Sequence, residues 1–247
     1  MLILGVTPYH QVIFLFTLIY EPIIKSVKIL TLIFLFNKKR GLLLMGFMDG
    51  SIKIVSNIYA DERKTVFEVK ELHQKYVVRV KWGQDCFATA SYDKTVCLFN
   101  LQPGGEATEG KYQFSKKWSF CGNVESIEFT PDYLTLIVAV RGDNYLNYIN
   151  LSTYEINRVN MNANGDDHVS FTPMHIQCSP SGEHLLVQTD KDRIIVMRTH
   201  TPIQSRNLYG TINNEFSQPR ACWHPSGKYI YGVHFLFSFF FPVSFFY

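Results

Sequence analysis

The stretch VVRVKWGQDCFATASYDKTVCLF, residues 77–99, contains the pattern that decides the fold. In its first part, apolar Val78, Val80 and Trp82 alternate with charged side chains, which is the period of a β-strand with one covered face. The following run, CFATAS, is largely apolar on both faces, as in a strand buried on both sides of its sheet. An Asp-Lys step at Asp93 then reverses the chain. Residues 77–99 therefore predict three consecutive antiparallel strands.

The same pattern recurs along the chain at a nearly constant interval. Segments similar to VVRVKWG are VESIEFTPD, MHIQCSPSG and RACWHPSG, with LIFLFNKKRG as a weaker copy. Their aligned positions, 46, 47, 49 and 45 residues apart, are Phe36, Trp82, Phe129, Cys178 and Trp223. The SPSG and TPD endings are turn chemistry, because Pro fixes φ and Gly or Asp accepts the tight geometry. The chain therefore contains an internal repeat.

A turn aspartate is a second landmark with the same period. It lies between two apolar runs in LLLMGFMDGSIKIV, CFATASYDKTVCLF, TLIVAVRGDNYLNYI and HLLVQTDKDRIIVM. The aspartates are Asp49, Asp93, Asp143 and Asp190, with Asp192 as the alternative in the fourth copy. No helical period of useful length occurs between residues 41 and 233. Two independent landmarks indicate four strands about every 45 residues.

This unit resembles the WD40 repeat, whose four-stranded blades close radially into a β-propeller. The resemblance covers residues 41–233 and depends on the SPSG-type turns and the turn aspartates. The Trp-Asp dipeptide that names the family is replaced in every copy, for example by Phe99-Asn100, and the Gly-His landmark remains only as Leu72-His73. The resemblance implies an all-β fold, namely a partial WD40-type β-propeller of about four four-stranded blades.

The resemblance also implies roles for individual residues. In the family, a histidine near the start of a blade and the turn aspartate join a buried hydrogen-bond network that locks the strands, so we expect His73 and Asp93 to form such a stabilising pair. The expected structural repeat positions are His73, Asp49, Asp93, Asp143 and Asp190.

The implied function is a protein–protein interaction scaffold, whose partners are other proteins bound through loops and strand ends. Fold alone does not give the partner or the pathway. By their positions in the repeat, four charged residues should point to solvent or lie near loop ends, and they are candidates for partner contact: Arg79, Lys81, Glu128 and Arg141.

Catalysis, cofactors and metals are not expected. No nucleophile recurs beside His73 and Asp93, and the sequence has no glycine-rich phosphate loop. The histidines and cysteines show no ligand set with zinc spacing. We therefore expect no enzymatic activity, no cofactor, no metal and no small-molecule substrate. A hydrolytic enzyme on a propeller scaffold is the weakest alternative.

The net charge limits which classes of partner are expected, and the cysteine content indicates the cellular compartment. The formal net charge is +3 over 247 residues, which lacks the basic footprint of a nucleic-acid-binding domain. The five cysteines are odd in number and include no CxxC pair, so they do not predict a disulfide framework. We expect no nucleic-acid partner and a cytoplasmic or nuclear protein with reduced thiols.

The two ends of the chain differ from the repeats. The tail, residues 234–247, reads HFLFSFFFPVSFFY, has no charge and no turn aspartate, and is shorter than the about 20 residues that span a bilayer. Residues 1–40 form a second apolar segment. The predicted organisation is an apolar arm at 1–40, WD40-like repeats at 41–233 and an apolar tail at 234–247.

Three interpretations of the arm stay open. Arm and tail can be non-native sequence, such as translated intron, that flanks a propeller fragment. Alternatively, the arm is a signal anchor with basic residues 38–40 as its cytoplasmic flank, which would make a membrane-tethered propeller. No basic region precedes the apolar stretch and Pro22 interrupts it, so a membrane is not an expected partner. In the third interpretation residues 31–36 form the first strand of a blade, because Phe36 keeps the repeat register.

Overall fold

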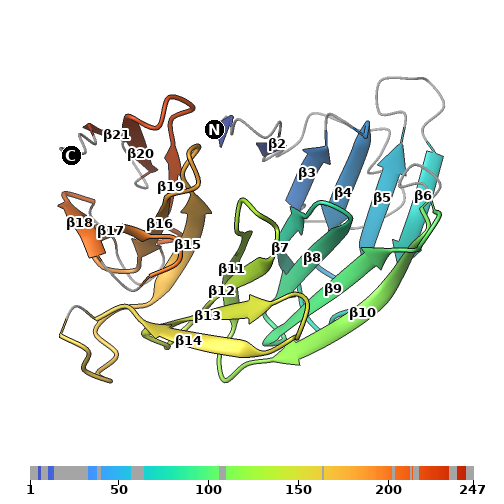
Figure 1. Ribbon diagram of the computed structural model, residues 1–247, viewed down its shortest axis with the longest axis horizontal. Coiled ribbons are helices and arrows are strands. Elements are labelled where there is room, and N and C mark those ends of the chain that lie inside the picture. The colour runs from blue at the N-terminus through green and yellow to red at the C-terminus, as the bar shows by residue number, and fades with distance from the viewer. Residues whose placement is uncertain are drawn as a thin grey trace. The chain divides into compact units, whose positions relative to one another are not determined.

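The structure is a computed structural model, and it describes these residues: 5–6, 11–13, 33–37, 40–56, 64–105, 110–162, 164–201, 204–211, 213, 217–233 and 238–242. Throughout this described part of the chain the regular elements are β-strands, without a helix, which confirms the all-β prediction. The chain divides into two units, Met1–Ser119 and Phe120–Tyr247 (Figure 1). The predicted arm and tail lie mostly outside the described residues.

Unit 1 contains two antiparallel sheets. Sheet A has the strand order β1-β2-β3-β4-β5-β6, with β1 (Gly5–Val6), β2 (Gln11–Ile13), β3 (Ile33–Asn37), β4 (Leu42–Gly46), β5 (Ile52–Ser56) and β6 (Lys64–Val69). Sheet B has the order β10-β9-β8-β7, with β7 (Val77–Trp82), β8 (Cys86–Ser91), β9 (Thr95–Leu101) and β10 (Tyr112–Ser119). The decisive sequence stretch thus forms the first three strands of sheet B.

Unit 2 contains three antiparallel sheets. Sheet C consists of β11 (Val124–Phe129), β12 (Thr135–Val140), β13 (Tyr145–Asn150) and β14 (Ile156–Asn160). Sheet D consists of β15 (Pro173–Cys178), β16 (His184–Thr189), β17 (Arg193–Arg198) and β18 (Gln204–Tyr209). Sheet E consists, among the described residues, of β19 (Arg220–Trp223), β20 (Tyr229–Val233) and β21 (Ser238–Pro242). In each sheet, neighbouring strands are consecutive in sequence, which is the order of an antiparallel meander.

Sheets A and B of unit 1 share an aromatic core. Phe87 and Phe99 stack with their ring centroids 4.8 Å apart, and Phe67 meets both rings edge-on. Trp82 and Tyr112 pack against Phe87 and are buried. Burying an aromatic side chain removes 150–250 Å² from water, so this cluster of rings is a principal stabilising contact of unit 1.

In unit 2 the cores are aliphatic. Sheets C and D pack through fully buried side chains such as Ile137, Leu146 and Ile176. Sheets D and E pack through Leu186 and Trp223 among others. The central strands β12, β13, β16 and β17 are buried almost throughout, as expected for strands covered on both faces.

Hydrogen bonds between neighbouring sheets connect positions one repeat apart. Their sequence separations are 47, 50, 49 and 46 residues, which matches the repeat of the sequence. The donor and acceptor pairs are Trp82 Nε1 and the Leu35 carbonyl (3.0 Å), Ile176 N and Ser126 Oγ (3.2 Å), Cys178 Sγ and the Phe129 carbonyl (3.7 Å), and Trp223 N and Gln177 Oε1 (2.9 Å). The repeat in the sequence therefore corresponds to a repeat in the structure.

The SPSG-type turns of unit 2 also meet one repeat apart. Gly182 has a φ of +80°, and a Cβ atom added there would lie 2.5 Å from Cγ of Pro131 in the preceding turn. Only glycine combines this conformation with so close an approach. The turn chemistry thus fixes the packing of sheet D on sheet C.

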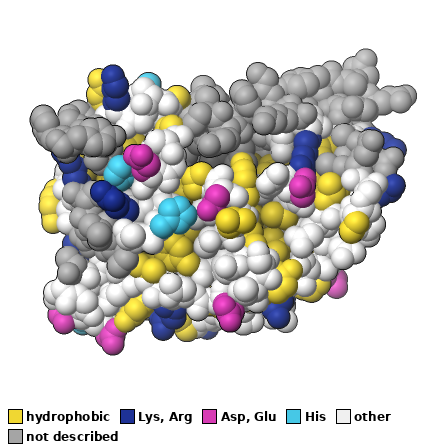
Figure 2. All heavy atoms as spheres, viewed as in Figure 1, with side chains coloured by type: hydrophobic (Ala, Val, Ile, Leu, Met, Phe, Trp, Pro, Cys, Tyr) yellow, Lys and Arg dark blue, Asp and Glu magenta, His cyan; other side chains and the backbone are white. Residues whose placement is uncertain are grey.

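On one face of the molecule (Figure 2), charged side chains are distributed rather than gathered. On the face shown in Figure 2, described Lys and Arg side chains are interspersed with Asp and Glu side chains. This face carries no continuous basic stripe of the kind that follows a nucleic-acid backbone.

Candidate functional site

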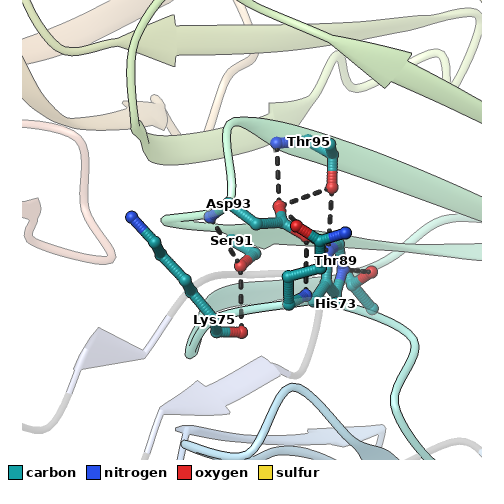
Figure 3. Close-up of polar contacts among 7 residues, drawn as sticks. His73, Lys75, Thr89, Ser91, Asp93 and Thr95 are labelled. Atoms are coloured by element: carbon teal, nitrogen blue, oxygen red, sulfur yellow. Dashed lines mark hydrogen bonds and ion pairs between the residues drawn. The ribbon is translucent and has the colours of Figure 1, made fainter.

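A polar cluster lies where the loop before β7 meets the turn between β8 and β9 (Figure 3). His73 from the loop is 2% exposed, and its Nδ1 lies 3.1 Å from Asp93 Oδ2 and 2.9 Å from Thr95 Oγ1. Its Nε2 lies 2.8 Å from Thr89 Oγ1. The structure therefore brings His73 and Asp93 together and adds two threonines to them.

The hydrogen-bond pattern indicates which tautomer the neutral His73 ring adopts. A carboxylate accepts only, so Nδ1–H donates to Asp93, and in the neutral ring Nε2 accepts the proton of the Thr89 hydroxyl. The Thr95 hydroxyl and its backbone N–H both donate to Asp93 Oδ1, at 2.6 and 3.0 Å. The side chains of this cluster are mutually satisfied, which is the condition under which a buried polar network stabilises a fold.

Further bonds attach the loop to the turn. The Gln74 N–H donates to Asp93 Oδ2 at 3.0 Å, and the Asp93 N–H donates to Ser91 Oγ at 3.0 Å. The Ser91 hydroxyl in turn donates to the Lys75 carbonyl at 3.1 Å. Loop and turn are thus held by side chains as well as by the strand ladder.

Burial and hydrogen bonding change the ionisation of this pair. Burial lowers the pKa of His73 from its ordinary value, and the neighbouring Asp93 carboxylate offsets this effect only in part. Burial raises the pKa of Asp93, but hydrogen bonds from Thr95 and the Gln74 N–H, together with the interaction with His73, outweigh it, and the pKa ends below its ordinary value. At neutral pH the pair is a neutral imidazole beside a carboxylate.

Asp93, His73 and Thr89 have the order of contacts found in an acyl-transfer triad, namely carboxylate, imidazole and hydroxyl. Burial decides against that chemistry here. Thr89 is 0% exposed and His73 is 2% exposed, so a substrate carbonyl has no approach to the Thr89 oxygen. A nucleophile must be reachable by its substrate, and this hydroxyl is packed inside sheet B.

The other turn aspartates make different contacts. Asp49 is exposed and accepts from the N–H and hydroxyl of Ser51, at 2.9 and 2.6 Å. Asp190 accepts from the Thr172 N–H at 2.7 Å. Its alternative, Asp192, accepts from the Asn213 N–H at 2.8 Å.

Asp143 forms an ion pair with an arginine in place of a histidine. Its two oxygens each lie 2.9 Å from an amino nitrogen of Arg158 on β14, and the Tyr145 N–H donates to Oδ1 at 3.0 Å. The Arg158 guanidinium also lies 4.3 Å from the centroid of the Tyr145 ring. Asp143, in the turn between β12 and β13, is thus held by a side chain of β14 rather than by the loop before β11.

The four residues expected to face partners differ in exposure. Arg79 is half-buried, with its Nη1 donating to the Val78 carbonyl at 2.6 Å, and Glu128 is half-buried on β11. Arg141 is exposed, and its Nε donates to Glu125 Oε1 at 2.6 Å. Glu125 itself is buried, so this ion pair fixes the position of the Arg141 guanidinium.

Lys81 corrects a sequence expectation. It is only 6% exposed, so the expectation that it faces solvent is wrong. The strand β7 has a bulge between Val77 and Arg79, after which Lys81 pairs with the fully buried Ala88. Both faces of this end of β7 are covered, and simple alternation therefore fails there.

Sequence reasoning missed Thr89, Thr95 and Arg158. The two threonines had a signal, since each is a polar residue in an otherwise apolar run on either side of Asp93. Arg158 had none, because its partner depends on the register of β14 against β13.

Comparison with known proteins gives the fold. No protein-family model matches the sequence, and no curated protein sequence matches it. By contrast, 1385 chains of solved structures match. One is a chain of the structure described as "Crystal Structure of Mitotic Checkpoint Complex", with 11% sequence identity and a TM-score of 0.66 over 86% of this chain and 68% of that chain. The fold is that of a partial WD40-type β-propeller. At this identity the likeness concerns the fold alone.

Sheets B, C and D are therefore four-stranded blades of a propeller, and the His73 cluster lies in blade B. In the part of the chain that the structure describes, no group of three or more His, Cys, Asp or Glu side chains is arranged to hold a metal ion. The same described residues include no helix that is both long and apolar enough to cross a membrane. Most of the arm at 1–40, where an anchor was considered, including residues 14–32, lies outside them.

Proposed function

We propose that this propeller is a protein–protein interaction scaffold of the WD40-repeat type that acts in the cytoplasm or nucleus. The observation that carries the proposal is the buried His73–Asp93 cluster, which fixes the loop before β7 on the β8–β9 turn. A loop that is rigid before binding loses little conformational freedom when a partner docks. The exposed side chains of loop and turn are thereby presented in one arrangement.

The thiols support the proposed compartment. None of the five cysteines, all within the described part of the chain, forms a disulfide, and disulfides are rare in cytosolic and nuclear proteins. Burial raises the pKa of both Cys86 and Cys97 to about 12, which keeps these two thiols protonated and unreactive. Stable reduced cysteines inside the sheets are compatible with a reducing compartment.

Site-specific photo-crosslinking in cells tests the scaffold function. A photoreactive amino acid replaces Gln74 in the loop of blade B, Lys191 in the β16–β17 turn of blade D, or Lys64 at the start of β6; all three side chains are exposed. We expect discrete protein adducts from Gln74 or Lys191 and none from Lys64, the control on a strand edge. Equal capture at all three positions, or none at any, contradicts the proposal.

A further inference from the structure

Two tyrosines stand beside the His73 cluster on unit 1. Tyr76 is 45% exposed, and its ring centroid lies 5.6 Å from that of Tyr92. The Tyr92 N–H donates to the Tyr76 carbonyl at 3.2 Å, so the backbone holds the two residues side by side. Tyrosine gives a large apolar contact with a polar tip at low cost in side-chain entropy, and it is enriched in protein interfaces for that reason.

Two lysines flank this aromatic pair. Lys75 precedes Tyr76, Lys94 lies in the same β8–β9 turn as Tyr92, and both lysines are exposed. Among the described residues, neither lysine side chain has a hydrogen-bond or ion-pair partner. Figure 3 shows the Lys75 side chain leading away from the polar cluster, while its carbonyl accepts from Ser91.

Exposed lysines outnumber exposed acids around this pair. The exposed lysines are Lys70, Lys75 and Lys94; the exposed acids are Glu71 and Asp49, which lies in the β4–β5 turn that packs on the loop, while Asp93 is buried beside His73. An unpaired cationic surface attracts and orients a partner of opposite charge.

Lys94 occupies a backbone position that favours glycine. Its φ is +70°, and its N–H donates to the Ser91 carbonyl three residues earlier. In sheet A the corresponding turn has the same bond, from the Gly50 N–H to the Phe47 carbonyl, and Gly50 has a φ of +83°. A lysine in this left-handed conformation is strained, and strained residues gather at functional sites. This backbone conformation places the long cationic side chain of Lys94 at the tip of the turn.

We infer that Tyr76, Tyr92, Lys75 and Lys94 form a binding surface, the Tyr–Lys surface, for an acidic peptide segment that carries an aromatic side chain. The lysines pair with the carboxylates of the segment, and its aromatic side chain packs on the tyrosine pair. This inference rests on the proposed scaffold function and names the chemistry of a partner. Single-stranded nucleic acid also combines negative charge with rings, but the near-balanced charge of the chain and the interspersed charges in Figure 2 favour a peptide.

Fluorescence anisotropy with four labelled probes tests the partner chemistry on the full chain. The probes are a twelve-residue Glu/Asp peptide with a central Phe, the same peptide with Ala for Phe, a Lys-containing counterpart, and a twelve-nucleotide oligothymidine. We expect the acidic Phe peptide to bind tightest and to weaken as salt rises. Tighter binding of the oligothymidine, or equal binding of the Lys peptide, overturns the inference.

Four variants test the surface itself. Lys75→Glu and Lys94→Glu should each weaken the acidic Phe peptide by roughly tenfold, because each reverses a charge at the interface. Tyr76→Ser should weaken the Phe peptide more than the Ala peptide. Lys64→Glu makes the same charge change on an exposed β6 lysine and should leave the affinity unchanged. Equal losses in Lys64→Glu and Lys94→Glu indicate a general charge effect and overturn the inference.

Lys94→Gly separates binding from folding. Glycine removes the charge and relaxes the backbone at φ +70°, so the melting temperature should stay the same or rise while peptide binding is lost. Unchanged peptide affinity in Lys94→Gly overturns the inference. If crosslinking from Lys191 still captures proteins while no peptide binds, only the Tyr–Lys surface fails; if both fail, the scaffold proposal fails as well.

Discussion

At the scale of single residues, one buried carboxylate joins a loop to a turn. Asp93 accepts from His73 Nδ1, from the Gln74 N–H and from both the N–H and the hydroxyl of Thr95. Asp49, at the corresponding turn of sheet A, accepts only from Ser51 among the described contacts and is exposed. Aspartates at corresponding turns thus differ in the number of hydrogen bonds that they accept and in their burial.

Replacement of these two aspartates should therefore differ in effect. Asp93→Ala leaves buried donors without an acceptor and should lower the unfolding free energy by about 2–4 kcal/mol. Asp49→Ala removes two exposed hydrogen bonds with Ser51 and should cost about 1 kcal/mol or less. Urea denaturation of both variants measures the difference. Equal losses would show that the His73 cluster adds nothing to an ordinary turn.

The ionisation of His73 predicts a pH dependence of stability. Its pKa is lowered on folding, so the unfolded chain binds a proton more readily, and stability is lost as the pH falls through the unfolded value of about 6.5. Asp93 also has a lowered pKa, and its contribution is lost only in the more acidic carboxyl range. Besides Asp93, the charge acting on His73 is Lys117, which lowers its pKa further.

The stability difference between the native chain and His73→Gln isolates this effect. It should shrink between about pH 8 and about pH 5, because only the native chain has to keep the buried imidazole neutral. His184 also has a lowered pKa but is present in both proteins and cancels. A difference that grows toward acid would mean that the folded state favours the imidazolium.

At the scale of elements, turns of adjacent sheets pack through proline and glycine. Gly182→Ala must adopt a φ near +80° and also place a Cβ 2.5 Å from Pro131, and it should cost about 2–3 kcal/mol. Gly227→Ala has a similar φ of +70°, but its nearest contact, Pro180, lies 3.9 Å away, so it should cost about 1 kcal/mol. Thermal melts of the two variants check this order, and the reverse order would disprove the contact.

Strand periodicity and turn chemistry were sufficient to predict the elements of sheets B, C and D. They were not sufficient for Lys81, because both faces of this end of β7 are covered. Nor could they choose between Asp190 and Asp192, since both carboxylates accept backbone bonds, from Thr172 and Asn213. These outcomes depend on strand register and on loops distant in sequence, which a local pattern does not contain.

At the scale of the whole molecule, the reactivity of the five thiols indicates whether both units are folded. Cys121 is exposed, whereas Cys97 is buried, and burial raises the pKa of Cys97 and of the half-buried Cys86 to about 12. A thiol reagent should therefore modify Cys121 rapidly in the native protein, and the other four cysteines, which are buried or half-buried, more slowly. Cys121→Ser should abolish the fast phase. A fast phase that persists in this variant would show that another thiol is accessible in the folded chain.

The hydrogen bonds that reach back one repeat, such as Trp82 to Leu35 and Trp223 to Gln177, have an evolutionary consequence. Tandem duplication of a full repeat would give each such donor an acceptor of the same kind. The array can therefore lengthen without leaving a polar group that lacks a hydrogen-bond partner. Insertion of a single residue within a strand would shift the register and turn its apolar side chains outward. Variation in this protein should thus accumulate as whole repeats and as changes in loop length, and hardly at all as insertions inside strands.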